Sequence, residues 1–416
     1  MIKSRALSSA LKSKSESRFG RIIVLTGARQ TGKTTLARKC FPEFKYLSIE
    51  DPVTRGDYTQ LTAGQWHERF PKAILDEVQK EPVLIESIKS VYDQHEDTSY
   101  ILLGSSQLLL LQKIKESLAG RCSIFEVFPL TIPELLSNNW ETQVQPSFFQ
   151  TFIGTGVLPD TSYPFRLHPK YPEIMEAYNH YLQFGGYPAL SDPTLHNNER
   201  EDWLRNYIQT YLERDVRDLA DFRNLEPFIQ IQRTTALLTG NVLNFSLLAR
   251  EAGVSANTAH RFLHYLELSY QAILLKPWYR NHLKRLTRSP NIHYLDPGIQ
   301  RTIIRKQGGM SGNEFESAII AEIFKQTRHL RFSGDLYHLR TVDGREMDLL
   351  IELENGYVAI EIKMTTKVSG TDARHLKGLA EILDKPLMQS FVISNDTEVK
   401  DFGENVIAMP AAMFLS

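Results

Sequence analysis

Short apolar runs alternate with stretches of helical periodicity over the first third of the chain. The runs at 21–27, 45–50, 72–77 and 99–106 are bounded by turn or polar residues, which is typical of buried β-strands. Because helical stretches separate them, the strands are predicted to run parallel in one sheet with helices on its faces. The pattern therefore indicates an α/β domain over 21–175.

The alternation of apolar and helical stretches stops before the end of this domain, and a different pattern follows the domain. Residues 137–175 are rich in Pro, Gly, Asn and Thr and are predicted to form an irregular insertion in the first domain. Residues 176–306 are predicted to form a mainly helical domain, and residues 307–416 a second α/β domain. Residues 1–20 precede the first strand as a basic extension.

The composition of the chain indicates a globular protein and excludes several other classes. The 416 residues suffice for two or three domains, and 42% hydrophobic with 23% charged residues is an ordinary globular mixture. A net charge of −1 excludes a globally basic nucleic-acid coat but leaves local basic patches open. The two cysteines, Cys40 and Cys122, allow neither a disulfide framework nor a cysteine-based zinc site. No apolar run approaches the roughly 18 residues that span a bilayer, so we expect a cytoplasmic protein with no membrane partner.

A phosphate-binding motif follows the first strand. The segment from Gly27 to Thr34 matches G-x-x-x-x-G-K-[ST], with a predicted strand before it and a predicted helix after it. Lys33 is expected to reach the β- and γ-phosphates, and the Thr34 hydroxyl to bind Mg²⁺. The residues expected to bind ATP here are Gly27, Ala28, Arg29, Gln30, Thr31, Gly32, Lys33, Thr34 and Thr35.

Two acids end the third strand, in the segment AILDEVQ. Asp76 is expected to reach the Mg²⁺, and Glu77 to orient or deprotonate the attacking water. Two weaker signals follow in the same domain. Ser105 is a candidate sensor of the γ-phosphate, and Arg121 is a candidate for charge stabilisation in its own site or in that of a neighbouring subunit. A solvated loop residue is the alternative for each of these two.

Residues 245–270 carry the pattern of a helix-turn-helix. Gly253 would supply the turn between two helices, Ser255 would cap the second helix, and apolar residues at helical spacing would face inward. The outward polar residues predicted to contact DNA are Asn257, Thr258, Arg261 and His264. A rigid spacer between domains is the alternative role for this module.

A basic segment follows at 276–306, with eight Lys and Arg against the single acid Asp296. Arg280, Lys284 and Arg285 in this segment are predicted to contact DNA as well. The alternative is a solvated basic strand edge.

A hairpin of two strands is predicted over 346–363, because the Asn355-Gly356 dipeptide favours a two-residue type I′ turn. Such a turn would pair 350 with 361 and place Asp348 opposite Lys363, with Glu361 diagonal to Asp348 on the same face. Two acids and a lysine in this arrangement can bind Mg²⁺ and activate water at a phosphodiester. We therefore predict a metal site at Asp348 and Glu361, with a surface ion pair as the alternative.

Glu316 is a candidate third acid for this site. It falls among apolar residues at helical spacing in the segment NEFESAIIAEIFKQ. A carboxylate at such a position is costly unless it is paired or binds a metal.

Together these segments resemble a large prokaryotic family, the AAA-like P-loop ATPases with a C-terminal domain of unknown function. The likeness runs from about Arg18 and is carried by GARQTGKTTL, AILDEVQK, the GSS strand, SLAGR with PLTIPEL, FGGYPAL, YLERDV, YLDPGI and GNEFES. It implies an AAA-like core, a winged-helix-type module and a domain similar to restriction-endonuclease-like nucleases. In that likeness one residue set serves ATP and a second set the nuclease: Lys33, Thr34, Asp76 and Glu77, then Glu316, Asp348, Glu361 and Lys363.

The sequence therefore predicts a Mg²⁺-dependent ATPase that binds and acts on DNA, with ATP and Mg²⁺ as cofactors. Its C-terminal domain would either cut DNA or only grip it. One alternative is a nucleotide switch that binds DNA or a protein partner as a regulator or defence sensor. Another is an ATPase whose C-terminal domain holds a protein partner without nucleic acid. An arginine finger acting in trans would require a homo-oligomer.

Overall fold

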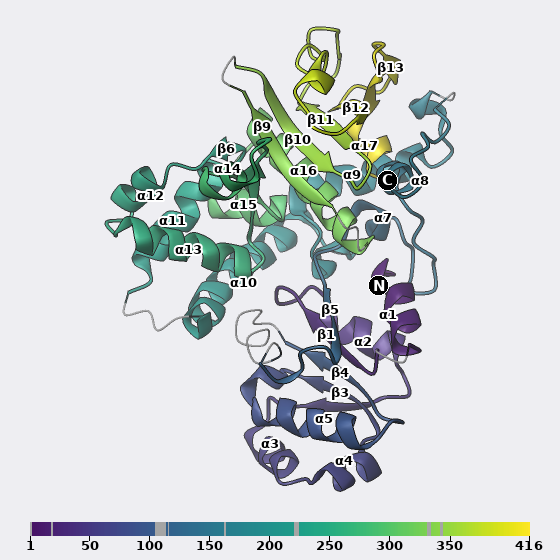
Figure 1. Cartoon of the computed structure of the whole chain (residues 1–416), viewed down its shortest axis with the longest axis vertical. Helices are drawn as coiled ribbons and strands as arrows, with labels where there is room; N and C mark the ends of the chain where they lie inside the picture. Colours follow the sequence, from purple (N-terminus) through teal and green to yellow (C-terminus); the bar gives the residue numbers. More distant parts are fainter. Residues whose placement is uncertain are drawn as a thin grey trace.

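Two β-sheets organise the protein, for which the structure is a computed structural model. It describes residues 2–17, 20–104, 114, 116–161, 164–219, 224–330, 334–341 and 344–416, with the backbone alone over 211–219. The five-stranded sheet and its helices form the lower part of Figure 1, and a nine-stranded sheet with further helices forms the upper part. Over the part of the chain that is described, no helix is both long and apolar enough to cross a membrane.

The first sheet is parallel throughout, in the order β2-β3-β4-β1-β5. Its strands are β1 (Ile22–Thr26), β2 (Lys45–Ser48), β3 (Lys72–Asp76), β4 (Ser99–Leu103) and β5 (Cys122–Glu126). Its helices are α1 (Leu7–Ser15), α2 (Lys33–Cys40), α3 (Pro52–Thr59), α4 (Ala63–Arg69) and α5 (Val83–Gln94). The predicted α/β class with a parallel P-loop sheet is confirmed.

Alternate residues of the central strand β1 face opposite sides of this sheet. Ile22 and Val24 pack with α5 on one side, and Ile23 and Leu25 pack with α1 and α2 on the other. Because β1 is buried on both faces, it consists almost entirely of apolar residues. The first helix, α1, comes from the segment that precedes β1, and its Leu7 and Leu11 lie in the second of these cores.

The segment 137–175, predicted to be irregular, contains the helix α8 (Phe148–Thr155), so that prediction was wrong. A capping box starts the helix, with Ser147 and Gln150 each bonding to the other's backbone N–H. Phe148, Phe149 and Phe152 of α8 pack in a core shared with the C-terminal sheet. The Pro- and Gly-rich flanks hid a helix whose apolar partners lie far away in the sequence.

The middle of the chain is helical and includes three short strands. Its helices are α9 (Tyr171–Phe184), α10 (Asn197–Leu219), α11 (Glu226–Leu237), α12 (Phe245–Glu251), α13 (Ala256–Leu268), α14 (His282–Thr287) and α15 (Pro297–Ile303). Its strands are β6 (Asn241–Val242), β7 (Ala272–Pro277) and β8 (Asn291–Tyr294), and β8 pairs antiparallel with both of the others.

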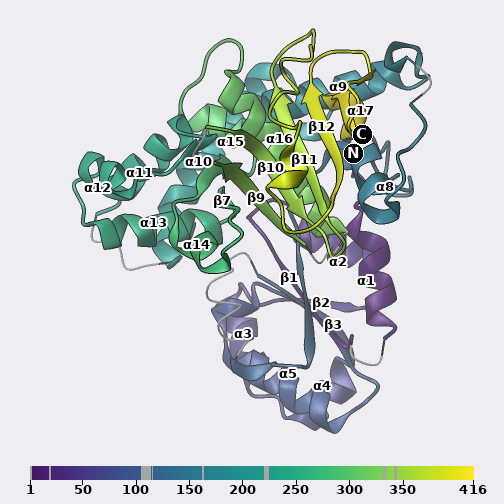
Figure 2. The same cartoon turned by 45° about the horizontal axis from the view of Figure 1, so that its top comes forward.

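The C-terminal part contains α16 (Gly312–His329), α17 (Ala411–Phe414) and six strands. These are β9 (Asp335–Arg340), β10 (Glu346–Glu352), β11 (Tyr357–Lys363), β12 (Leu387–Ser394), β13 (Lys400–Asp401) and β14 (Val406–Pro410). Because β7 pairs with β9, one sheet runs on through the middle strands in the order β13-β14-β12-β11-β10-β9-β7-β8-β6. Figure 2 shows β9 to β12 side by side with β7 beyond β9.

Short helices complete the fold. The α-helix α7 (Ile132–Leu135) follows β5, and 3-10 turns lie at Val78–Lys80, Phe165–Leu167, Pro188–Ser191 and Leu379–Glu381.

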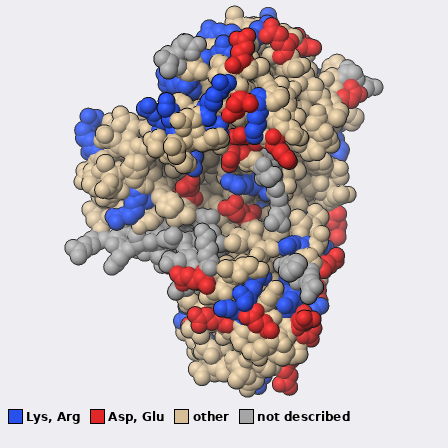
Figure 3. All heavy atoms as spheres, viewed as in Figure 1, with Lys and Arg blue, Asp and Glu red and all other residues tan. Residues whose placement is uncertain are grey.

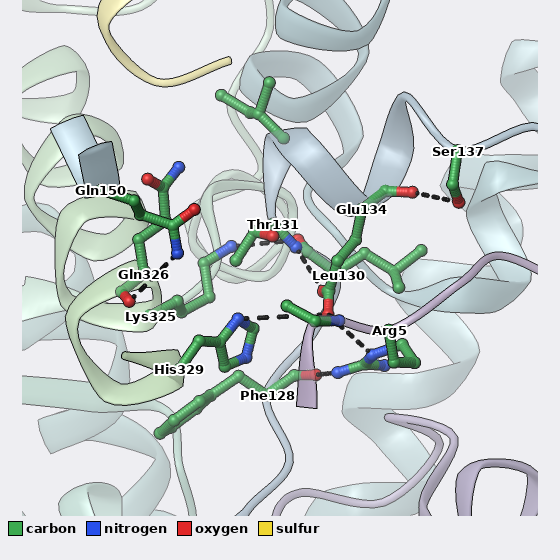
Figure 4. A network of polar contacts seen from close by, with 12 residues as sticks. Arg5, Phe128, Leu130, Thr131, Glu134, Ser137, Gln150, Lys325, Gln326 and His329 are labelled. Carbon is green, nitrogen blue, oxygen red and sulfur yellow. Dashed lines mark hydrogen bonds and ion pairs between the residues drawn. The ribbon is translucent and has the colours of Figure 1, made fainter. Parts of the chain in front are cut away.

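A buried polar network ties the segment after β5 to α16 (Figure 4). Glu322 and Lys325 of α16 form an ion pair of 2.8 Å with both side chains fully buried. Glu322 accepts the backbone N–H of Ile132 at 2.7 Å, and Lys325 donates to the Leu130 carbonyl at 3.2 Å. These bonds connect the segment after β5 to α16, the longest helix of the C-terminal part. Buried polar groups are costly unless they are hydrogen-bonded, so each group here depends on its partner.

Candidate nucleotide site and carboxylate cluster

The loop after β1 has the backbone that a phosphate-binding loop needs. Gly27 has a φ of +146° and Gly32 a φ of +89°, both in a region that side-chain-bearing residues rarely adopt. A Cβ atom at Gly27 would lie 2.2 Å from the Val127 carbonyl oxygen, so the neighbouring strand requires glycine there. Gly32 is also the N-cap of α2, which directs the first amides of that helix into the loop.

The predicted phosphate ligand Lys33 is folded over this loop. Its ammonium group donates to the Gly27 and Ala28 carbonyl oxygens at 2.8 and 2.7 Å, and its side chain is buried. Lys33 is the first residue of α2, so the positive end of the helix dipole adds to its charge. The loop thus brings a positive charge and the first amides of α2 together, as anion-binding loops do.

Asp76 and Thr34 meet across the loop. The Thr34 hydroxyl donates to Asp76 Oδ2 at 2.7 Å, and the Tyr46 hydroxyl donates to the same oxygen at 2.9 Å. Burial, and then the charge of Asp76, raise the pKa of Tyr46 to about 12, so Tyr46 remains a donor. A hydroxyl and a carboxylate are the hard oxygen ligands that Mg²⁺ prefers, so this pair fits the ion that accompanies ATP.

Glu77 follows in a left-handed conformation with a φ of +57°. At this residue the backbone leaves the extended path of β3. The Gln79 side-chain amide donates a hydrogen bond to the Glu77 carboxylate. The residues that the sequence analysis missed here are Tyr46 and Gln79. Gln79 lies within the AILDEVQ segment, whereas nothing in the sequence of β2 marks Tyr46.

The two weaker predictions for the ATP site have different outcomes. Ser105 lies outside the described residues. Arg121 precedes β5 at the edge where Cys122 pairs with Ile22, whereas the phosphate loop follows the opposite end of these strands. It pairs there with Asp93, at 2.8 Å between Nε and Oδ1. Arg121 is therefore misplaced for a role in its own site, and only a role in a neighbouring subunit remains a prediction.

The helices α12 and α13 lie where the helix-turn-helix pattern predicts them. Gly253 has a φ of +64° in the turn, and the Ser255 hydroxyl accepts the Thr258 amide N–H at 3.1 Å. Apolar residues of α13 are buried against α11 and α12, as Leu263 and Leu266 illustrate. Three of the residues predicted to contact DNA are exposed on α13 and Thr258 is half-buried: Asn257, Thr258, Arg261 and His264.

Arg285, predicted to contact DNA, is instead a buried structural residue, so that prediction was wrong. Its side chain is only 3% exposed and pairs with Glu352 at 2.8 Å. It also lies over the rings of Trp278 and Tyr337, 5.2 and 4.9 Å from their centres. A guanidinium enclosed in this way cannot reach a phosphate in solution.

The other two residues predicted in the basic segment lie at the surface. Lys284 is exposed on α14. Arg280 is exposed as well, although its guanidinium donates to the Leu383 carbonyl at 3.2 Å.

The hairpin β10–β11 forms, but its register differs from the predicted one by two residues. Leu349 pairs with Ile360 and Glu352 with Tyr357, so the loop is centred on Glu354 and Asn355. The physical reason lies at Gly356, where a Cβ atom would lie 2.4 Å from the Pro386 carbonyl oxygen. Its φ is not positive, so this glycine permits a close approach of the chain and does not form a type I′ turn.

Despite this shift, the structure brings the four predicted residues together. Counting back from Leu349, Asp348 lies beside Glu361, and Asp348 Oδ2 accepts the Ile362 amide N–H at 2.6 Å. Lys363 pairs with Glu361 at 2.5 Å. Glu316 of α16 lies near enough to this cluster that, besides burial, the charges of Asp348 and Glu361 raise its pKa.

Burial and mutual repulsion shift the protonation of this carboxylate cluster. Burial, followed by the charge of Asp348, raises the pKa of Glu361 to about 8. The same two causes raise the pKa of Glu316, and burial raises that of Asp348. Among the residues that the structure describes, no group of three or more His, Cys, Asp or Glu has the arrangement of a metal site. The metal site at Asp348 and Glu361 therefore stays a prediction.

A hydrogen bond joins the residue that follows α13 and its C-cap to the last residue of β1. Tyr270 adopts a φ of +59° just after α13, and its hydroxyl bonds to Thr26 Oγ1 at 2.9 Å. Thr26 is the residue before Gly27 of the phosphate loop. Tyr270 also lines a cavity of about 550 Å³, together with Glu126 of the first sheet, Phe324 of α16 and Tyr337 of β9.

Comparison with known proteins identifies the parts of the chain. Residues 20–136 match the family of an AAA domain, 175–308 match a domain of unknown function called DUF8612, and 311–414 match a domain of unknown function called DUF4143. An uncharacterized protein of Mycobacterium tuberculosis is 26% identical over 411 residues, covering 95% of this chain and 81% of that protein. An uncharacterized protein of Methanocaldococcus jannaschii is 22% identical over 273 residues, covering 61% of this chain and 56% of that one.

Among solved structures, a Walker-type ATPase of Pyrococcus abyssi is similar to this chain at 17% identity and a TM-score of 0.46. The similarity covers 74% of this chain and 99% of that one. The AAA match spans the phosphate loop and its acids, and the DUF4143 match spans the carboxylate cluster. Residues 20–136 therefore belong to an AAA domain of the P-loop ATPases, and residues 311–414 to a DUF4143 domain.

Proposed function

We propose that this ATPase is DNA-dependent: DNA held by the helical domain controls ATP hydrolysis in the AAA domain. The observation that carries the proposal is the bond between Tyr270, at the end of α13, and Thr26, directly before the phosphate loop. A helix that moves when it grips DNA would pull on the strand that leads into the loop. Figure 3 shows Lys and Arg interspersed with Asp and Glu on the face drawn, which is consistent with local contacts and not with a broad basic field.

The order of elements supports a winged helix as the DNA-binding module. The helices α11, α12 and α13 are interrupted by β6 after α11, and β7 and β8 follow α13. These three strands pair antiparallel in the order β6-β8-β7. In this arrangement α13 takes the place of a recognition helix, with Arg261 and Asn257 suited to phosphate and base contacts. Lys284 on α14 lies between β7 and β8, where a wing would contact the backbone.

In the ATPase reaction each residue of the loop has a distinct role. Lys33 and the amides at the start of α2 bind the phosphate oxygens, while Thr34 and Asp76 hold Mg²⁺. Mg²⁺ supplies charge neutralisation on the phosphate oxygens when bound. Glu77, oriented by Gln79, accepts a proton from the attacking water or orients it toward the terminal phosphate.

Steady-state ATP turnover with Mg²⁺ tests the proposal, without DNA and with single-stranded, duplex or branched DNA. We expect one form of DNA to stimulate turnover and Tyr270→Phe to reduce that stimulation without lowering basal turnover. The matched control is Tyr265→Phe on the same helix, because the Tyr265 ring packs on Phe262 within the helical domain. A rate of ATP turnover that no form of DNA changes would contradict the proposal. It would favour a nucleotide switch or a protein partner.

Salt-dependent DNA binding provides a second test. Arg261→Ala and Lys284→Ala should each weaken binding and reduce the dependence of affinity on salt, because each phosphate contact releases a counterion. Arg205→Ala is the control, since this exposed arginine lies on α10 and pairs with Asp202. Equal effects of all three variants would move the DNA contact away from α13 and α14.

A second candidate function is a metal-dependent nuclease in the DUF4143 domain. One observation favours it: Glu361 Oε2 is buried yet accepts no hydrogen bond from the described residues, in a cluster of mutually repelling carboxylates. A divalent cation held by Asp348 and Glu361 would satisfy that oxygen, and it supplies an activated water when bound. Lys363 would stabilise the developing charge on the phosphodiester.

DNA cleavage assays with Mg²⁺ or Mn²⁺ test this activity directly. Glu361→Gln should abolish cleavage and leave ATP turnover unchanged, because the two sites share no residue. Wild-type protein that never cuts DNA with either ion would refute the nuclease function and leave the domain as a gripping or partner-binding module.

A further inference from the structure

The segment before α1 is an integral part of the protein, although it is only weakly patterned in the sequence. Ser4 and Arg5 are buried, with 7% and 5% of their surfaces exposed. The Ser4 amide donates to the Ser137 hydroxyl at 2.9 Å, and the Ala6 amide donates to Glu134 at 2.8 Å. These bonds hold residues 4–6 against the segment that follows β5.

Arg5 uses its guanidinium to connect three parts of the AAA domain, and Figure 4 labels two of its partners, Phe128 and Glu134. Its Nε donates to Glu134 Oε1 at 3.1 Å, and its Nη2 to the Phe128 carbonyl at 2.7 Å. Its Nη1 donates to the Thr31 carbonyl at 2.8 Å, inside the phosphate loop. A planar guanidinium is suited to this task because its donors leave in fixed directions.

The bond to Thr31 has a geometric consequence for the next amide. In a trans peptide the C=O and the following N–H point in opposite directions, and no described peptide bond is cis. A Thr31 carbonyl held outward by Arg5 therefore turns the Gly32 N–H to the opposite side, away from Arg5. Gly32 has a φ of +89° and no Cβ, so its neighbouring peptide planes rotate more freely than those of other residues.

Glu134 explains why this arginine keeps its position. The carboxylate is fully buried in α7, and its second oxygen accepts the Thr131 amide at 3.0 Å. It thus fixes Arg5 and caps α7 at once, so the guanidinium does not have to be ordered when nucleotide arrives. Pre-ordering of this kind lowers the entropic cost of binding.

We propose that Arg5 is a positioning residue of the nucleotide site: it orients the Thr31–Gly32 peptide so that the Gly32 amide is ready for a phosphate oxygen. Arg5 itself does not touch the nucleotide. The segment 4–6 is then a part of the ATP site, and its ligand is the phosphate chain of ATP or ADP. The proposal concerns nucleotide binding alone and does not depend on DNA or nuclease activity.

Isothermal titration of the full chain with ADP tests this role. Removing Arg5 alone would leave Glu134 as an unpaired buried charge, which destabilises a fold strongly. The informative comparison is therefore Glu134→Gln against the double variant Arg5→Met with Glu134→Gln. We expect Glu134→Gln, whose amide oxygen can still accept from Arg5, to lose part of the ADP affinity. The double variant should bind ADP about tenfold more weakly than Glu134→Gln, the loss typical of one well-oriented hydrogen bond.

Two further variants separate positioning from simple packing. Lys3→Met is the matched control, because Lys3 donates to the Leu135 and Ser137 carbonyls but not to the phosphate loop. It should bind ADP as wild type does. Arg5→Lys, which keeps the charge but loses the fork, should raise the KM for ATP far more than it changes kcat. Equal ADP affinity of Glu134→Gln and the double variant would refute the proposal, because Arg5 would then serve only to neutralise Glu134.

Discussion

Replacing His293 with leucine should reduce the loss of stability that acid causes in this protein. His293 lies in β8 opposite Ile273 and is fully buried. Neither of its ring nitrogens has a hydrogen-bond partner among the described residues. Burial, and then the nearby charge of His338, lower the pKa of His293 to about 3. The imidazole therefore stays neutral in the folded protein at any moderate pH.

The unfolded chain behaves differently, and the difference sets the size of the effect. An imidazole in water has a pKa of about 6.5, so below that pH the unfolded state takes up a proton that the folded state refuses. Stability is therefore lost as the pH falls from about 6.5 toward the folded pKa. At pH 5 this single residue is expected to cost about 2 kcal/mol relative to neutral pH. The result depends little on the folded pKa, provided that it lies well below 5.

Urea unfolding at pH 7 and pH 5, followed by far-ultraviolet circular dichroism, measures the effect. Between these pH values His293→Leu should lose about 2 kcal/mol less stability than wild type, because leucine of similar volume cannot titrate. His196→Leu is the control, since His196 is exposed and its removal leaves the core unchanged. If wild type and His293→Leu lost the same stability between pH 7 and pH 5, the reasoning would be refuted.

Three further predictions concern the site and the fold. Lys33→Ala should abolish ATP turnover while leaving the circular dichroism spectrum unchanged, because the residue acts on phosphates; retained phosphate release would contradict its assignment. Arg285→Met should lower the free energy of unfolding by about 2–4 kcal/mol, since it breaks a buried ion pair. The DNA affinity of its folded fraction should equal that of wild type, and a selective loss of DNA binding would restore the sequence-based assignment. Gly356→Ala should cost about 1–3 kcal/mol in denaturant unfolding, because its Cβ would meet the Pro386 carbonyl. Gly370→Ala, in open space, should change stability by less than about 0.5 kcal/mol, and equal effects of both would exclude the close contact as the cause.

The parts of this protein that could be predicted from the sequence alone are those whose signals are contiguous in the chain. The phosphate loop was predictable because its glycines, Lys33 and the start of α2 form one short stretch of chain with one required backbone path. The same holds for α12 and α13, because a capping serine and a glycine in the turn decide helix ends locally. The alternation of short apolar runs with helical stretches likewise indicated the parallel sheet. In each case the residues that specify the structure are neighbours in the chain.

Which distant groups become partners could be seen only after the chain had been placed in its fold. Arg285 lies in a basic segment typical of a DNA contact, yet it is buried and pairs with Glu352, which is far along the chain. The β10–β11 register follows from the approach of Pro386 to Gly356, and the order of the N-terminal segment from the pairing of Arg5 with Glu134. Many surface arginines and glycines have the same local sequence signature as these. What distinguishes them is desolvation by residues that folding brings close, and a linear pattern does not contain that information.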